Sequence, residues 1–504
     1  MSVTSVAVLG LEAEPIIAEA GITNSATIFF IVGLPDTAVK ESKERLRFAI
    51  KNSGFFFPRQ HLTVNLSPAD IKKQGTMHDV AMALAILIAQ KELSKEAVKE
   101  SVFIGELGIH GEIRGVTGTL VAAIMAKERG FKRIFVPKEN ANEALLIEGL
   151  EVFAVDNLKD LVDHLNKEIS LTPAVSNLEL LPTTTNSIDF SEIRGQEHAK
   201  RGLEVAASGG HNLLMFGPPG SGKTLMARAL PSILPAPTQE EALEVTKIYS
   251  IAGTLRENTG LFTQRPFRSP HHSCSAAALI GGGSWPKPGE VSLAHRGVLF
   301  LDEFPEFSRH VLEHLRQPME DGVVTISRAL ASFRFPAKFM LVAAMNPCPC
   351  GYAGDPTGRC NCPFSRISSY KKKISGPLID RIDLTVSVPR VETEKLTNNV
   401  ISESSEEVRK RVQAARDRQL IRFKNHNIVS NSEMSPRIVT EFCELDKEGK
   451  MLIHTAMEKW RLSARAYTRT LKLARTIADL DQSEKITPRH LAEALSYRSQ
   501  EEIF

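Results

Sequence analysis

Residues 213–224 constrain the fold more than any other part of the chain. An apolar run, LLMF, leads into GPPGSGKT, and a strand, a glycine-rich loop and a helix that opens with Lys-Thr form a phosphate-binding P-loop. In such a loop, backbone N–H groups and the positive end of the helix surround the phosphates. The pattern predicts an α/β fold with a parallel sheet, and ATP with Mg²⁺ as ligands. The alternative is a glycine-rich turn without a ligand.

The residues of this loop have different expected roles. Lys223 is expected to reach the β- and γ-phosphates, and Thr224 is expected to hold Mg²⁺. The predicted nucleotide-binding residues of the loop are Gly217, Pro218, Pro219, Gly220, Ser221, Gly222, Lys223 and Thr224.

Two later apolar runs also end in polar residues. Residues 297–303 read GVLFLDE, and residues 339–346 read FMLVAAMN. Asp302 is expected to bind Mg²⁺ and Glu303 to polarise the attacking water, the division of labour that phosphoryl transfer requires. Asn346 is expected to orient this water or to sense the γ-phosphate. The alternatives are a helix cap for Asp302 and a turn residue before Pro347 for Asn346.

Length and patterning divide the chain into four segments. A chain of 504 residues exceeds what one hydrophobic core usually serves. Alternating strand and helix patterns predict an α/β domain over residues 1–170, and the aperiodic residues 171–187 predict a linker. Residues 188–390 are the expected P-loop core, and residues 391–504 are an expected helical lid. In the first domain, strands are predicted at residues 28–32, 62–66, 134–136 and 152–155. In the lid, helices are predicted at residues 406–424, 436–442, 447–461, 464–480 and 488–497.

Composition excludes some classes of protein. Hydrophobic residues make up 42% and charged residues 24% of the chain, which is typical of a globular protein. No apolar run approaches the roughly 20 residues that span a bilayer, so no membrane association is expected. The first residues do not resemble a secretory signal, and a cytoplasmic location is expected. The net charge of +3 says little about partners.

Four of the six cysteines lie within fifteen positions. They are Cys348, Cys350, Cys360 and Cys362 in a loop rich in Gly and Pro. Four thiolates around Zn²⁺ form a closed structural site, so the cluster predicts zinc. Reduced structural cysteines and redox thiols are the alternatives.

Longer motifs carry a resemblance to a known family. They are RPFRSPHHS from residue 265, GGGSWPKPGEVSLAHRGVLFLDEFPEF from residue 281, NPCPCGYAGD from residue 346 and SGPLIDRIDL from residue 375. With the P-loop they resemble the Mg-chelatase-like AAA+ ATPases of the YifB/ComM family, over nearly the whole chain. The resemblance implies an AAA+ core with a helical lid, a hexameric ring, and an ATP-driven helicase that promotes branch migration of DNA.

Two arginines gain roles from this resemblance. Arg381 resembles the arginine finger that reaches the γ-phosphate of a neighbouring subunit; the alternative is an ion pair with Asp380 or Asp383 in the same chain. Arg465 resembles the sensor arginine that contacts nucleotide within its own chain, with Arg469 as the second choice. Arg461, Arg465, Arg469 and Lys472 share one helix face, which can also be a solvated face.

Two segments of the core are expected to face DNA. Residues 320–335 predict a hairpin with Arg328 near its tip, which resembles the pore hairpin of related rings. Residues 248–283 form a second insertion that carries Arg265, Arg268, His271 and His272. Phosphate contact and simple solvation are both open for these basic residues. The two histidines have no acidic partner beside them in the sequence, so packing or subunit contacts are expected.

The first domain resembles the Lon protease fold, through VNLSPADIKKQG from residue 64 and GELGIHGEIRGVTGTLVAAIMAKERG from residue 105. The expected Ser-Lys dyad is absent, because Thr76-Met77-His78 stands where the serine should be and Lys127 is displaced. The domain is therefore expected to be a scaffold or to recognise a protein partner. For the whole chain, the alternatives to a DNA motor are a magnesium chelatase-type ATPase subunit and a chaperone or remodelling scaffold.

Overall fold

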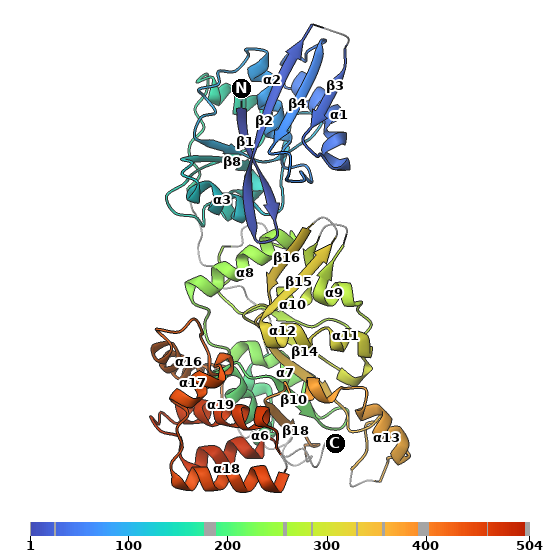
Figure 1. Ribbon diagram of the computed structural model, residues 1–504, viewed down its shortest axis with the longest axis vertical. Coiled ribbons are helices and arrows are strands. Elements are labelled where there is room, and N and C mark those ends of the chain that lie inside the picture. Colours follow the sequence, from blue (N-terminus) through green and yellow to red (C-terminus); the bar gives the residue numbers. More distant parts are fainter. Residues whose placement is uncertain are drawn as a thin grey trace. The chain divides into compact units, whose positions relative to one another are not determined.

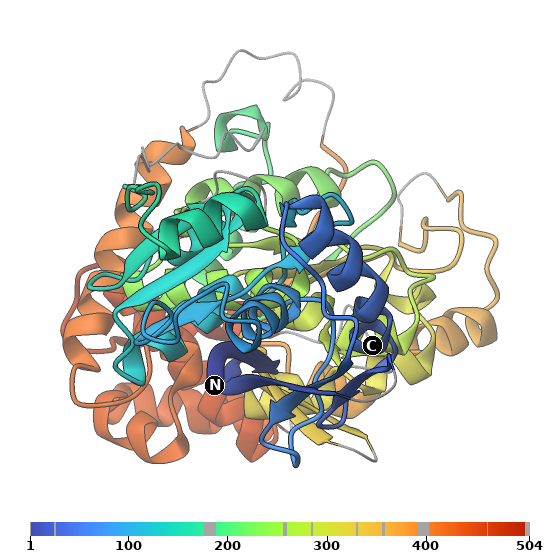
Figure 2. The same ribbon diagram turned by 90° about the horizontal axis from the view of Figure 1, so that it is seen from above.

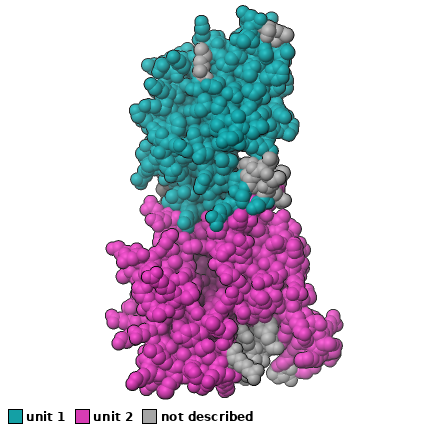
Figure 3. All heavy atoms as spheres, viewed as in Figure 1, with its two compact units in different colours: residues 1–181, 242–262, 327–335 teal, residues 182–241, 263–326, 336–504 magenta. Residues whose placement is uncertain are grey.

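The computed structural model describes residues 2–24, 27–175, 188–255, 260–283, 286–328, 331–354, 358–391, 403–460 and 462–498. It contains two compact units (Figure 3). Unit 1 comprises residues 1–181, 242–262 and 327–335, and unit 2 comprises residues 182–241, 263–326 and 336–504. Most of the expected linker, residues 176–187, lies outside the described residues.

Unit 1 is built on a mixed sheet of seven strands in the order β3-β4-β2-β1-β5-β8-β9. The strand β2 pairs antiparallel with both β1 and β4, whereas the remaining neighbours are parallel. The strands are β1 (Ser2–Leu9), β2 (Glu12–Thr23), β3 (Phe29–Val32), β4 (His61–Ser67), β5 (Ser101–Phe103), β8 (Arg133–Pro137) and β9 (Glu151–Val155), and a small separate ribbon pairs β6 (Glu106–Leu107) with β7 (Ile113–Arg114). The four strands expected in this domain are present.

Helices cover both faces of this sheet (Figures 1 and 2). On β8, Phe135 belongs to one apolar cluster while its neighbours Ile134 and Val136 belong to another, as the alternation of a strand requires. The first cluster includes side chains of α1 (Thr37–Asn52), α2 (Asp79–Ala89) and α5 (Leu158–Leu165). The second includes those of α3 (Thr119–Glu128) and α4 (Ala141–Ala144).

Two segments expected in the P-loop core belong to unit 1. The first, residues 242–262, contains most of α8 (Gln239–Ala252). In this helix the Ser250 hydroxyl donates to Glu143 at 2.9 Å, and the Ser250 carbonyl accepts from Gly118 N at 3.1 Å. The second is the outer part of the hairpin formed by β15 (Val323–Arg328) and β16 (Ala331–Pro336), where buried Phe333 lies against Gly10. Contacts distant in sequence decide this membership, so strand and helix periodicity could not predict it.

The core of unit 2 is a parallel sheet of five strands in the order β11-β14-β17-β10-β18. Its strands are β10 (Leu213–Phe216), β11 (Phe267–Arg268), β14 (Val298–Leu301), β17 (Met340–Met345) and β18 (Leu384–Ser387). Because all pairs are parallel, the carboxyl ends of β10, β14 and β17 meet at one edge of the sheet. Ligands bind at this edge in open α/β sheets.

The C-terminal helices share one apolar core with this sheet. Leu213 and Val342 of the sheet lie in the same cluster as Val412, Leu473 and Leu491, so the lid is packed on the core. These helices are α16 (Ser405–Arg422), α17 (Pro436–Phe442), α18 (Lys447–Trp460), α19 (Ala464–Leu480) and α20 (Pro488–Ser496). The five expected helices are thus present; α16 begins one residue early because Ser404 and Glu407 form a capping box.

Further helices and strands belong to unit 2. They are α6 (Glu197–Gly209), α7 (Lys223–Ile233), α9 (Ala276–Ile280), β12 (Gly281–Gly282), β13 (Lys287–Pro288), α10 (Glu290–Leu293), α11 (Arg309–Glu313), α12 (Arg316–Asp321), α13 (Phe364–Lys371) and α14 (Gly376–Ile379). Among the described residues, no helix combines the length and the apolar character needed to cross a membrane.

Candidate nucleotide site

The carboxyl edge of the five-stranded sheet brings together the two predicted Mg²⁺ ligands. Thr224 opens α7, and Asp302 follows β14 directly. The Thr224 hydroxyl donates to Asp302 Oδ2 at 2.7 Å, although 78 positions separate the two residues. A hydroxyl and a carboxylate oxygen in contact are the ligands that Mg²⁺ takes beside a P-loop. These two residues therefore fit a magnesium ion, which would supply positive charge beside the nucleotide phosphates.

Lys223 is held inside the P-loop. Its ammonium group donates to the carbonyl oxygens of Gly217 and Pro218 at 2.7 and 2.8 Å and to Asn346 Oδ1 at 3.1 Å. Burial lowers the pKa of Lys223 to about 8, while the charge of Asp302 acts in the opposite direction. Asn346 thus lies beside the lysine, directly after the end of β17.

Backbone geometry explains the glycines of the loop. A Cβ at Gly217 would meet the Val388 carbonyl oxygen at 2.0 Å, so only glycine fits there. Gly220 and Gly222 have φ values of 75° and 95°, which L-residues rarely adopt. Ser221 is buried, and Pro219 lies against Gly351 of the cysteine loop. Gly222 precedes α7, whose free N–H groups point toward the loop.

Glu303 projects from the same edge but is free to meet water. Its backbone is left-handed, with φ 50° and ψ 45°, and its side chain is 55% exposed. Glu303 Oε2 lies 3.3 Å from His272 Nδ1, and the His271 and His272 rings are 4.1 Å apart. No acid lies beside the histidine pair in the sequence, and the structure brings one from a distant strand end.

Arg381 lies at the opposite edge of the sheet. The Arg381 carbonyl accepts a hydrogen bond from Asn212 Nδ2 at 2.9 Å. Asn212 directly precedes the first residue of β10, whereas the P-loop follows the last residue of that strand. The side chain is buried, donates to the Pro377 carbonyl at 2.7 Å and pairs with Glu320. An ion pair within the chain thus exists, but its partner is Glu320 and not Asp380 or Asp383.

The lid arginines reach this opposite edge too. Arg465 is 61% exposed and lies 3.8 Å from Glu320, so it shares a carboxylate with Arg381. Arg469 pairs with Asp383 at 3.1 Å. Burial alone would raise the pKa of Asp383, but Arg469 and His211 outweigh it and hold that pKa below its usual value. Arg461 lies outside the described residues.

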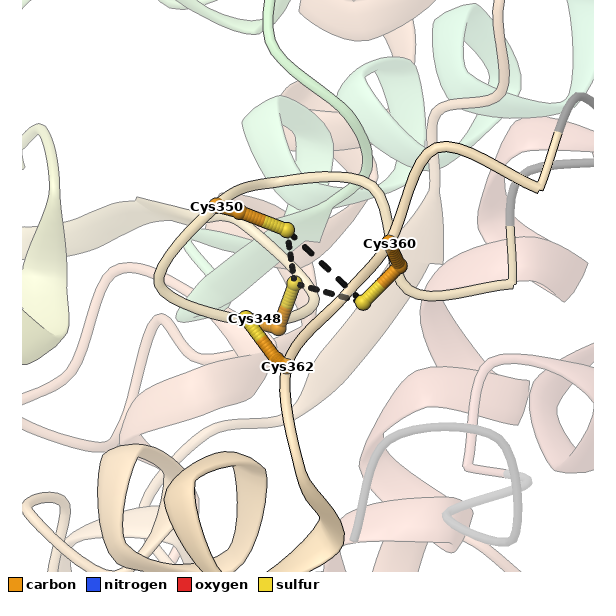
Figure 4. A group of neighbouring side chains, drawn as sticks. All are labelled: Cys348, Cys350, Cys360 and Cys362. Atoms are coloured by element: carbon orange, nitrogen blue, oxygen red, sulfur yellow. Dashed lines mark hydrogen bonds between the residues drawn. The ribbon is translucent and has the colours of Figure 1, made fainter.

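The four cysteines converge on one point (Figure 4). Their sulfurs all lie within 4.8 Å of one another. Cys348 Sγ is 3.3 Å from Cys350 Sγ and 3.7 Å from Cys360 Sγ, and Cys350 and Cys360 are also 3.7 Å apart. A tetrahedral ion with metal–sulfur distances of about 2.3 Å requires sulfur–sulfur edges of about 3.8 Å. The donor set and spacing fit one metal ion.

Two of the arginines expected to face DNA are used inside the protein. Arg265 is almost buried and donates to Glu241 and to the carbonyls of Pro235 and Arg296. Arg268 forms a double hydrogen bond with Glu290 at 2.6 and 2.7 Å. Their charges are already neutralised, so these side chains brace the insertion instead of offering a phosphate contact. The predicted hairpin is present, but the Arg328 side chain lies outside the described residues.

The position of Thr76 in unit 1 does not resemble a protease dyad. Its hydroxyl pairs with Glu106, and a carboxylate cannot supply the lysine of a Ser-Lys dyad. Lys127 is exposed on α3.

Family models match nearly all parts of the chain. The model of magnesium chelatase, subunit ChlI, matches residues 189–396; that of subunit ChlI of Mg-chelatase matches residues 18–140; and the C-terminal model of the same subunit matches residues 402–498. Together with the parallel sheet and the P-loop, these matches define an AAA+ ATPase of the Mg-chelatase-like class.

Similar proteins narrow the assignment. The chain is 43% identical over 500 residues to uncharacterized protein YifB of Escherichia coli, covering 98% of this chain and 96% of the relative. It is 42% identical over 501 residues to competence protein ComM of Haemophilus influenzae, covering 99% and 97%. The chain belongs to the YifB/ComM family. A magnesium-chelatase 38 kDa subunit of Cereibacter sphaeroides is 29% identical over 174 residues, covering 31% of this chain and 52% of the relative.

Substitutions at the carboxyl edge test the assigned roles. Lys223→Ala is expected to abolish ATP binding, because it removes the cation that meets the β- and γ-phosphates. Glu303→Gln is expected to keep ATP bound and to slow hydrolysis by about 10²- to 10⁴-fold, the usual contribution of a positioned base. Steady-state phosphate release and binding of a fluorescent ATP analogue measure the two effects.

Glu306→Gln is the matched control for Glu303→Gln. Glu306 lies three positions further on, is exposed and pairs with Lys373 at 3.1 Å. Normal hydrolysis by Glu303→Gln, or an equal loss in Glu306→Gln, would show that Glu303 is not the base.

Proposed function

We propose that this chain is an ATP-driven DNA motor, a hexameric helicase that promotes branch migration in homologous recombination or natural transformation in the cytoplasm. The observation that carries the proposal is the cluster of predicted hydrolysis residues at one sheet edge, with Thr224 against Asp302 at 2.7 Å and an exposed Glu303 beside them. A nucleotide-gated scaffold would not need Glu303. Identity over almost the full length to a competence protein supports DNA as the substrate.

In the proposed reaction, Lys223 exchanges its bonds to the loop carbonyls for phosphate oxygens. Thr224 and Asp302 would hold Mg²⁺, and the ion would supply positive charge to the phosphates. Glu303 polarises the attacking water, and His272 positions this carboxylate through their contact of 3.3 Å. Asn346, 3.1 Å from the Lys223 ammonium group, senses the γ-phosphate.

The ring supplies cations that a single chain does not. Arg381 and Arg465 meet at Glu320, on the edge of the sheet opposite to their own P-loop. We assign both arginines to the nucleotide of a neighbouring subunit. Glu320 holds the two side chains until they contact that nucleotide. An arginine finger of this kind contributes about 10³- to 10⁵-fold in rate.

We further propose that the cysteine cluster holds a structural Zn²⁺. Four thiolates leave no open position on the ion, so its role is to brace the loop rather than to take part in hydrolysis. The braced loop borders the P-loop, since a Cβ at Gly351 would meet Pro219 Cδ at 2.6 Å. Cys348 also follows Asn346 by two positions.

The N-terminal domain has a separate role in this proposal. It acts as a scaffold with a non-catalytic Lon-like fold and recognises a partner. The alternative function for the whole chain is a magnesium chelatase-type ATPase subunit, which the three family models favour by their descriptions. A chelatase subunit or a chaperone would respond to protein partners and not to nucleic acid.

ATP hydrolysis with and without DNA distinguishes these functions. The purified protein is expected to hydrolyse ATP several-fold faster with single-stranded or forked DNA, because translocation couples DNA contact to turnover. Steady-state phosphate release is the measurement, with Glu303→Gln as the blank. A rate that is indifferent to DNA would overturn the motor in favour of the chelatase-type or chaperone functions.

Mixing two inactive variants tests the arginine finger. Arg381→Ala is expected to lose about 10³-fold or more in ATP turnover, and Lys223→Ala is expected to be inactive. Mixed rings should regain turnover, because a subunit with Lys223 intact then borrows Arg381 from its neighbour. A mixture as inactive as its components would place Arg381 outside the neighbour's site.

Metal analysis and two glycine variants test the cysteine loop. Freshly purified, reduced protein is expected to contain one zinc ion per chain. Gly351→Ala should keep zinc but bind a fluorescent ATP analogue several-fold more weakly, because its Cβ displaces Pro219. Gly354→Ala is the matched control, since it has a similar φ of 77° but meets no described atom within 4 Å. Absence of zinc would refute the metal site, and equal ATP binding by both variants would refute the contact with the P-loop.

A further inference from the structure

A groove on unit 1 combines aromatic faces with unpaired cations. It has a volume of about 850 Å³ and lies between the start of β3, the exposed side of α1 and residues 54–62. The strand β3 is the edge strand of its sheet, and α1 lies beside it (Figure 1). This volume falls in the range of small-ligand and cofactor sites. None of the residues already assigned to the nucleotide or metal sites lines the groove.

Cations follow one face of α1 and continue into the groove. Lys40, Lys43, Arg47 and Lys51 recur every three or four residues, which places successive side chains about 5–6 Å apart along a helix face. Lys43, Arg47 and Lys51 line the groove, and Arg59 adds a fourth cation. Glu44 is the single acid among its lining residues. Lining cations therefore exceed lining anions by three.

These cations have no acidic partners in the part of the chain that the structure describes. The ion pairs there include none of Lys43, Arg47, Lys51 and Arg59. Lys43 instead lies over the Phe30 and Phe29 rings, at 5.4 and 5.9 Å from their centroids. Arg265 and Arg268 of unit 2, by contrast, are fully neutralised by carboxylates. The groove thus keeps positive charge available for a ligand.

Aromatic rings lie open beside these charges. Phe56 is 55% exposed and Phe30 is 45% exposed. Phe29, Phe55 and Phe56 line the groove. Exposed aromatic faces beside a run of cations suit a chain of phosphates with unpaired bases, because each base can stack on a ring. A duplex keeps its bases stacked inside and cannot use these rings.

We propose that this groove binds single-stranded nucleic acid, through stacking on Phe56 and phosphate contacts to Lys43, Arg47, Lys51 and Arg59. In the proposed motor, the N-terminal domain then holds a displaced strand, so the partner of this domain is the nucleic acid itself. The inference deepens the proposed function, but it is tested without ATP and does not depend on hydrolysis. An acidic protein or a second copy of this chain are the competing occupants.

Fluorescence anisotropy of a labelled oligo(dT), with the full-length protein and no nucleotide, measures the binding. Phe56→Ala is expected to weaken binding about tenfold, within the range for loss of one stacked base, and to leave the salt dependence unchanged. Arg47→Gln is expected to lower the slope of log affinity against log salt by about 0.7, as for one lost contact to a single-strand phosphate. The two variants thus separate stacking from charge.

Matched controls come from the same domain. Phe48 is 50% exposed on α1 but does not line the groove, and Lys95 is an exposed lysine that also does not line it. Phe48→Ala and Lys95→Gln should bind oligo(dT) like the parent protein. Parent-like binding by Phe56→Ala and Arg47→Gln, or equal loss in the controls, would overturn the proposal.

Two further readouts exclude the competing occupants. Duplex DNA and poly-glutamate should compete several-fold less well than unlabelled oligo(dT) for the protein. Equal competition by poly-glutamate would indicate an acidic protein instead and overturn the proposal.

Light scattering should show the same oligomer for Phe56→Ala and the parent; a shift in assembly without a change in oligo(dT) binding would assign the groove to a subunit contact. If DNA fails to stimulate ATP hydrolysis but oligo(dT) still binds, the proposed DNA motor is overturned and the proposed groove is not.

Discussion

The parallel pairing of β10 with β17 and of β17 with β14 is the constraint on which the rest of unit 2 depends. Phe216 lies opposite Met345, and Leu301 lies opposite Ala343. Since the three strands run in one direction, the residues that follow them meet at one edge of the sheet. There Thr224 contacts Asp302, and Asn346 contacts Lys223. A parallel sheet also needs long connections, and these carry the insertions and the cysteine loop.

Charge pairing decides what each arginine can do. Arg265 of the insertion forms a buried pair with Glu241, and such a pair cannot give up one partner without leaving an uncompensated charge. Arg268 is held by two hydrogen bonds to Glu290. Glu320 is half-exposed and touches both Arg381 and Arg465. A carboxylate in water holds its partners weakly, so this cluster can exchange partners in a way that the insertion pairs cannot.

Local sequence patterns predicted most helices and strands of the lid and the core, but not the contacts between residues distant in the sequence. The P-loop, the strand ends and the five lid helices each reside in a short stretch of sequence, so periodicity and caps suffice. Four contacts were beyond such reasoning: Glu303 with His272, Arg381 with Glu320, Arg465 with Glu320, and Gly351 with Pro219. Each joins residues that are more than 30 positions apart in the sequence. The groove of unit 1 was missed for the same reason, although FFFPR at residues 55–59 is an unusual aromatic and basic run.

The class of the protein follows from the linear chain, because the P-loop, the acidic pair and the cysteine spacing can each be recognised from a few neighbouring residues. The linear chain also determined the type and order of most elements, since hydrophobic periodicity is local. Three features arise only in the folded protein: the edge of the sheet at which each arginine lies, the cations of the groove that remain unpaired, and the segments that join the N-terminal unit. Those outcomes depend on packing and on ion pairs between distant residues, and no local pattern encodes them.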